Sequence, residues 1–167
     1  MIIMSKAIRY FFVYGSLRPD DDSGQSWTKS AVSNLHAQKA RLCNAKLYQE
    51  EYACAVLLDS SSSKSSGCGI NDNCIVGYVL STNDEQLFKE KLRMFDEIEG
   101  YYSSSSNNNE YDRTVRDVEL IPSTKTDGNN SSIGKTRSVK AYVYHRTNQC
   151  DRKKLIPSGD WLHRERR

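Results

Sequence analysis

The chain has 167 residues, enough for one domain with a substantial hydrophobic core. Its formal net charge is +3 at pH 7, and the six basic and three acidic side chains of residues 151–167 account for all of it. A nucleic-acid-binding protein needs basic charge spread over its surface, so this balance argues against that class and predicts a solvated basic tail.

Two further bulk features concern membranes and metals. The first six residues are too short and too interrupted for a signal peptide, and no apolar run approaches membrane-spanning length. We therefore expect a soluble, cytoplasmic protein that makes no membrane contact. The five cysteines have no zinc-binding spacing, which predicts no metal site, and Cys43 and Cys54 lie in apolar runs typical of core thiols.

Most of the elements that the sequence predicts are short strands. Apolar or alternating runs typical of strands cover residues 8–14, 40–48, 52–58, 74–80, 111–121 and 139–144. A helix is predicted over residues 26–38, where Trp27, Ala31 and Leu35 share one face at fourfold spacing.

A second helix is predicted between residues 82 and 100. Thr82 followed by Glu85 is a capping-box pattern at its start, and Gly100 is a natural stop. The apolar stripe of this helix consists of Phe88, Leu92 and Phe95.

Polar segments interrupt the pattern near residues 60–73, 103–109 and 124–137. They bury too little apolar surface to offset the entropy of ordering, so we expect flexible surface insertions. No boundary separates two cores, and residues 1–167 are predicted to form a single domain. The sequence predicts an α+β fold, a small mixed β-barrel with one or two packed helices.

The first candidate site is the segment Tyr14-Gly15-Ser16-Leu17, where an apolar strand stops at a glycine. Gly15 permits close approach of the backbone, and the N–H groups of Ser16 and Leu17 can bind a carboxylate or an oxyanion. Tyr14 would supply a phenolic wall. An ordinary strand-to-loop turn is the alternative interpretation.

Glu99 is the second candidate, at the predicted helix end between Ile98 and Gly100. Apolar neighbours and the negative end of the helix dipole both raise the pKa of a carboxyl group, as proton transfer at neutral pH requires. A solvated glutamate is the alternative. Asp96 and Glu97 are interpreted as surface charges.

Two hydroxyl groups complete the set of candidates. Tyr111 opens a predicted strand, where it either packs in the core or donates a hydrogen bond to a substrate. A nucleophilic role for Ser16 is weakly supported, because the sequence has no G-x-S-x-G motif and its three histidines lie in no recognisable triad.

An ordered set of segments resembles one family. The segments are FVYGSL, ARLCNAKLY, IVGYVL, FDEIEGY, YDRTVRDV, AYVY and SGDW, which span most of residues 9–161. In this order they are similar to gamma-glutamylcyclotransferase-like proteins, which include plant avirulence-induced relatives and gamma-glutamylamine cyclotransferases.

The resemblance implies a small β-barrel enzyme, without metal or cofactor, that releases pyroglutamate from a small-molecule gamma-glutamyl amine or amino acid. It implies that Glu99 is the catalytic acid/base. The implied substrate-binding residues are Tyr14, Gly15, Ser16, Leu17 and Tyr111.

Within the family, YGSLR slightly favours the gamma-glutamylamine branch over the glutathione-specific one, whose tryptophan-containing stretch is absent. The leaving amine and the oligomeric state stay open. The acidic stretch 18–22 departs from the family pattern, which keeps a non-catalytic binding or interaction protein on the same barrel as the alternative.

Overall fold

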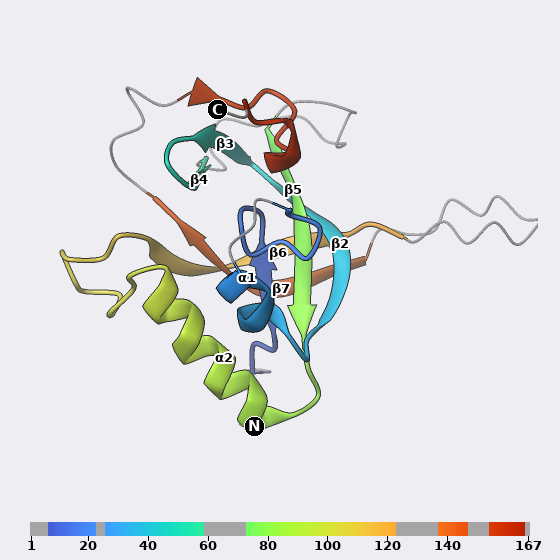
Figure 1. Cartoon of the computed structure of the whole chain (residues 1–167), viewed down its shortest axis with the longest axis vertical. Helices are drawn as coiled ribbons and strands as arrows, with labels where there is room; N and C mark the ends of the chain where they lie inside the picture. Colours follow the sequence, from blue (N-terminus) through green and yellow to red (C-terminus); the bar gives the residue numbers. More distant parts are fainter. Residues whose placement is uncertain (1–6, 23–25, 59–72, 123–136, 147–153, 166–167) are drawn as a thin grey trace, which may run out of the picture.

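The protein, seen in a computed structural model that describes residues 7–22, 26–58, 73–122, 137–146 and 154–165, is built around a closed five-stranded barrel (Figure 1). Its strands in barrel order are β1 (Tyr10–Val13), β5 (Cys74–Ser81), β2 (His36–Cys43), β6 (Asp112–Leu120) and β7 (Arg137–His145). β1 pairs parallel with β7, and the other pairs are antiparallel. The prediction of a small mixed barrel is confirmed.

A second sheet lies against one end of the barrel. Its strands in order are β4 (Ala53–Leu57), β3 (Ala45–Gln49) and β8 (Lys154–Leu155). The single strand expected over residues 40–48 is therefore wrong, because Asn44 adopts a left-handed backbone conformation (φ 57°) that turns the chain from the barrel into this sheet. Asparagine tolerates that conformation better than most residues.

Strand β1 is buried on both faces, which explains its continuous apolar run. Phe12 points into the barrel core, whereas Phe11 belongs to a second core between the barrel and the helices. The Phe11 ring stacks on Phe88 with centroids 4.5 Å apart and meets Phe95 edge-on at 4.8 Å. These contacts hold helix α2 (Glu85–Ile98) against the outside of the barrel.

The ends of α2 differ in detail from the sequence prediction. The N-cap is Asp84, whose carboxylate accepts hydrogen bonds from the N–H groups of Gln86 and Leu87, whereas Thr82 accepts from the Asp84 N–H. At the other end Glu99 is the C-cap, and Gly100 has a φ of +62° as a helix stop requires. The stop at Gly100 is confirmed, and the capping role moves from Thr82 to Asp84.

Helix α1 (Ser26–Val32) is shorter than expected, because Asn34 (φ 63°) ends the helical conformation and β2 begins at His36. Its last turn is held by Lys91 of α2. The Lys91 Nζ donates to the carbonyls of Ser30 (3.1 Å) and Ala31 (2.8 Å). The Ala31 carbonyl is one that a helix end leaves unpaired, whereas the Ser30 carbonyl also accepts from the N–H and the hydroxyl group of Ser33.

The remaining C-terminal elements are β8 and a short 3-10 helix, η2 (Trp161–His163), neither of which the sequence pattern predicted. Cys54 is fully buried as expected, whereas Cys43 is only partly buried and its sulfur lies 2.7 Å from that of Cys74 across the β2–β5 pair. None of the described helices is long and apolar enough to cross a membrane.

Of the three polar segments, residues 103–109 lie within the described chain and are mostly exposed. The Asn109 side chain bridges this loop, donating to the Ser103 carbonyl at 2.7 Å and accepting from the Tyr102 N–H at 2.8 Å. The other two segments, apart from Asn73 and Arg137, lie outside the described residues.

We expect Lys91→Met to lower the free energy of unfolding by about 1–3 kcal/mol, because it leaves the Ala31 carbonyl without the donor that Lys91 supplies. Lys89→Met on the same helix is the matched control. Lys89 is exposed and pairs with Glu85 one turn away, so its removal should change stability by less than about 0.5 kcal/mol. Urea unfolding measures the free energies of unfolding of both variants. Equal values would show that Lys91 does not hold α1.

Candidate active site

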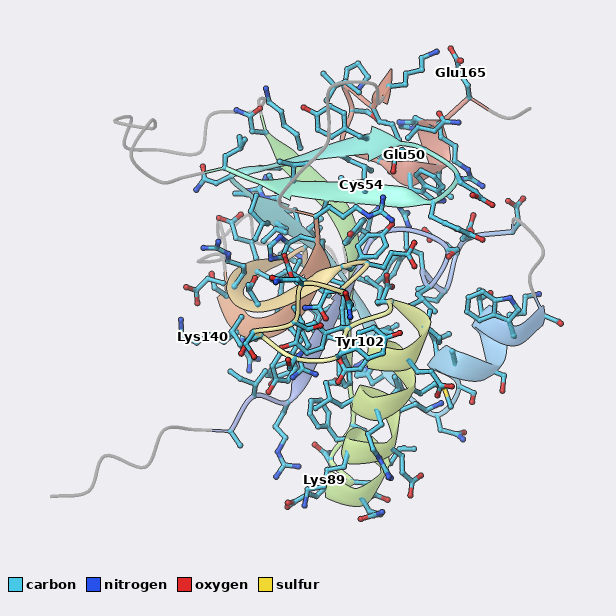
Figure 2. All side chains as sticks on the ribbon, turned by 90° about the vertical axis from the view of Figure 1, so that its left-hand side faces the viewer. Glu50, Cys54, Lys89, Tyr102, Lys140 and Glu165 are labelled. Carbon is cyan, nitrogen blue, oxygen red and sulfur yellow. The ribbon has the colours of Figure 1, made fainter. Side chains whose placement is uncertain are left out.

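A cavity of about 220 Å³ opens where β1 ends, between the C-terminal end of α2 and the start of β4. In Figure 2, Tyr102 marks this end of α2 and Cys54 marks the β3–β4 hairpin above it. The cavity is lined by all six residues that the sequence analysis selected: Tyr14, Gly15, Ser16, Leu17, Glu99 and Tyr111. The fold thus brings the two distant segments together.

The glycine loop forms a tight turn, in which the Arg18 N–H donates to the Gly15 carbonyl at 3.0 Å. Within the described part of the chain, the backbone N–H groups of Ser16 and Leu17 have no hydrogen-bond partner. Ser16 is partly exposed at the cavity wall. Unpaired backbone donors of this kind can bind a carboxylate or an oxyanion.

The loop is held in place by the buried side chain of Arg18. Its guanidinium contacts Asp160 at 2.6 Å, just before η2, and Asp20 at 2.8 Å. The Arg18 hydrogen bonds lower the pKa of Asp20. Asp20 of the acidic stretch 18–22 and Asp160 therefore neutralise the buried Arg18 cation beside the loop.

The basic C-terminal segment contributes to the same region. Arg164 contacts Asp21 at 3.3 Å and lies over the Trp161 ring at 4.6 Å. The expectation of a solvated basic tail is therefore wrong for Arg164, whose side chain is only 10% exposed.

Gly15 has a structural reason to be glycine. A Cβ atom at this position would lie 2.6 Å from the Cβ of Ala53, the first residue of β4. The close approach at Gly15 is thus between the loop and the second sheet. Any side chain here would push these two walls of the cavity apart.

The hydroxyl groups of Tyr14 and Tyr111 are engaged within the protein. Tyr14 donates to the Tyr144 carbonyl at 2.6 Å and accepts from the Ala55 N–H at 3.3 Å, while Tyr111 donates to the Ala53 carbonyl at 2.9 Å. Two of these three bonds, those with Ala55 and Ala53, join β4 to the rest of the protein. The two rings line the cavity, but their hydroxyl groups hold the second sheet against the barrel.

Glu99 presents a partly buried carboxyl group to the cavity, and no hydrogen bond to it forms among the described residues. The pKa of Glu99 is raised from 4.5 to about 7, mainly by loss of hydration and secondly by the negative charge of Glu110, while Arg146 opposes the shift. A carboxyl group with this pKa is present in both protonation states at neutral pH, as a general acid/base must be.

Glu110 and Arg146 are site residues that the sequence analysis missed. Arg146, just after β7, contacts Glu110 at 2.9 Å and Glu50 at 3.0 Å, and its guanidinium lies 4.6 Å from the centre of the Tyr111 ring. Glu110 lines the cavity and directly precedes Tyr111. No local pattern could have found this cluster, because its members come together only in the fold.

Asp96 is a further correction. It is partly buried and accepts hydrogen bonds from Arg113 at 2.6 Å and from the Tyr144 hydroxyl at 2.7 Å, so it links α2 to β6 and β7. The expectation of a surface charge fails because its two partners come from distant strands. Glu97, by contrast, is exposed as expected.

The nucleophilic alternative for Ser16 needs the histidine base of a serine hydrolase triad. Among the described residues that line the cavity there is no histidine. Nor do the described residues contain a group of three His, Cys, Asp or Glu side chains placed to hold a metal ion.

Comparison with known families finds one that matches nearly the whole chain. The family described as gamma-glutamyl cyclotransferase, AIG2-like, matches residues 11–163. The chain belongs to this family. Comparison with curated protein sequences gave no significant match.

Comparison with solved structures gave matches of low sequence identity to this member of the cyclotransferase family. An uncharacterized protein from Pyrococcus horikoshii is 20% identical, with 93% of this chain and 90% of the other covered and a TM-score of 0.49. An Arabidopsis thaliana protein is 20% identical over 94% and 71% of the chains (TM-score 0.49). An AIG2-like protein from Mus musculus is 22% identical over 84% and 78% (TM-score 0.45).

We expect Gly15→Ala to destabilise the protein by about 1–3 kcal/mol, because the new methyl group overlaps that of Ala53. In the double variant Gly15→Ala/Ala53→Gly the colliding methyl group is removed. It should therefore be more stable than the sum of the two single changes predicts, as a double-mutant cycle of melting curves measures. Additive losses would show that Gly15 does not pack on Ala53.

Proposed function

We propose that the protein is a gamma-glutamyl cyclotransferase, which converts a gamma-glutamyl amine or gamma-glutamyl amino acid to pyroglutamate and the free amine. The observation that supports this best is a glutamate with a pKa near 7 in the same cavity as a loop with unpaired backbone donors. Membership of the cyclotransferase family points to the same chemistry.

In the proposed reaction the substrate supplies its own nucleophile. The Glu99 carboxylate takes a proton from the substrate's α-ammonium group, and the resulting amine attacks the γ-carbonyl carbon to close a five-membered ring. The carbonyl oxygen becomes an oxyanion. Glu99 then returns the proton to the leaving nitrogen, and the bond between this nitrogen and the carbonyl carbon breaks as the carbonyl re-forms. The ring nitrogen gives up its second proton to the released amine through Glu99, so that pyroglutamate and a protonated amine remain.

The loop and the apolar walls have separate tasks in this proposal. The N–H groups of Ser16 and Leu17 bind the α-carboxylate or stabilise the oxyanion. Apolar side chains such as Phe95 and Ile98 line the cavity and would favour a compact pose of the glutamyl chain. Holding the amine against the carbonyl can lower the barrier by several kcal/mol through proximity alone.

We also propose that the whole chain is one such domain acting in the cytoplasm. The second function considered from the sequence, a non-catalytic binding protein, rested on the acidic stretch 18–22. In the structure Asp20 and Asp21 of this stretch pair with Arg18 and Arg164 beside the intact loop. That arrangement supports the loop, so it favours the enzyme.

Glu99→Gln should release pyroglutamate at least about a hundredfold more slowly than wild type, because an amide of nearly the same shape cannot carry a proton. Glu97→Gln, on the exposed side of the same helix end, is the matched control and should keep wild-type activity. In wild type, kcat/KM should rise with pH to a plateau above about pH 7, since the free enzyme needs the ionised carboxylate.

The activities of the two variants and the pH profile of wild type are measured by chromatographic detection of pyroglutamate released from a panel of gamma-glutamyl amines and dipeptides. A folded Glu99→Gln protein with full activity would rule out the mechanism. A wild-type protein that binds the panel but releases no pyroglutamate would favour the binding protein instead.

A further inference from the structure

The exposure of the lining residues separates the floor of the cavity from its mouth. Phe11, Phe12 and Phe95 are almost completely buried and form the floor. Trp27 and Tyr52 line the same cavity, yet these residues are 44% and 54% exposed. They therefore stand at the opening, one from α1 and one from the turn between β3 and β4.

Both exposed aromatic residues lie on anchored backbone. Trp27 belongs to α1, whose last turn is fixed by Lys91 and whose Ala31 is buried. Tyr52 directly precedes Ala53, which packs on the glycine loop and accepts the Tyr111 hydrogen bond. Large aromatic side chains held open to water beside a cavity are typical of binding surfaces, where a ligand covers them.

The proposed reaction determines which part of the substrate reaches this mouth. If the γ-carbonyl lies against Glu99 and the loop, the glutamyl part fills the inner cavity and the leaving amine points outward. Glu110 also stands near the opening, but its carboxylate is already paired with Arg146 at 2.9 Å. The groups at the mouth that remain available to bind a ligand are therefore the two exposed aromatic rings.

We propose that Trp27 and Tyr52 form a leaving-group subsite that selects gamma-glutamyl conjugates of amines bearing an aromatic ring. This inference rests on the proposed cyclotransferase function. Aromatic rings of the substrate would stack on or meet edge-on the indole and phenol rings, in the arrangements that aromatic pairs prefer. A small aliphatic leaving group would leave both faces in water.

The experiment compares two conjugates that differ only in this respect, gamma-glutamyl-phenethylamide and gamma-glutamyl-ethylamide. We expect kcat/KM to be about tenfold higher for the phenethylamide, through a lower KM. Trp27→Ala and Tyr52→Ala should each reduce this ratio toward one, and Trp27→Phe and Tyr52→Phe should restore most of it. Tyr102→Ala is the control, because Tyr102 is 74% exposed but does not line the cavity.

The outcomes separate the subsite from the reaction. Equal kcat/KM values for the two conjugates would overturn the subsite and leave the cyclotransferase function intact. If neither conjugate is turned over, the proposed cyclotransferase function is contradicted. Calorimetric binding of the phenethylamide then tests whether the subsite exists. Binding that weakens in Trp27→Ala and Tyr52→Ala but not in Tyr102→Ala would support it, and absence of binding would overturn it.

Discussion

Two tyrosine hydroxyl groups join the second sheet to the rest of the molecule, and the cavity depends on them. Tyr14 connects the end of β1 to Tyr144 of β7 and to Ala55 of β4, and Tyr111 connects the segment after α2 to Ala53. Both hydroxyl groups are buried, so losing either bond would leave a polar group without a partner, which costs more than the bond itself contributes. The second sheet is thereby fixed as one wall of the cavity.

This wall explains why Glu99 differs from an ordinary glutamate. Closing the cavity on the C-terminal end of α2 removes water from the carboxyl group, and this loss of hydration is the main cause of its raised pKa. Glu110 adds to the shift, and Arg146, which is bound to Glu110, moderates it. Because the pKa of Glu99 is higher in the folded protein, the free energy of unfolding falls as the pH rises from the ordinary value of 4.5 through about 7. The ionised carboxylate therefore destabilises the folded state at the pH where the site would work.

The barrel and most of the candidate site could be predicted from the sequence, because short local patterns indicate both. Strand β1 is a continuous apolar run, Gly100 marks a helix end, and Glu99 directly precedes it. The break at Asn44 was not predictable, because it depends on one left-handed residue within an otherwise regular alternation.

The rest of the site could not be predicted, since it arises from contacts between distant segments. Arg18 meets Asp160 across 142 residues, and Arg146 meets Glu110 and Glu50 from two different elements. The reason for a glycine at position 15 lies in Ala53, which is remote in sequence. Local patterns identify which residues can do chemistry, whereas their tuning depends on partners that only the fold supplies.

The proposed reaction depends on the protonation of one carboxyl group, which an NMR titration of glutamate side-chain carboxyl carbons measures directly. The Glu99 signal is the one missing from Glu99→Gln. We expect its midpoint at about pH 7, and a lower midpoint in Glu110→Gln, because that change removes a neighbouring negative charge. A Glu99 midpoint near the ordinary value of 4.5 would contradict the account, since it would mean that the cavity leaves this carboxyl group hydrated.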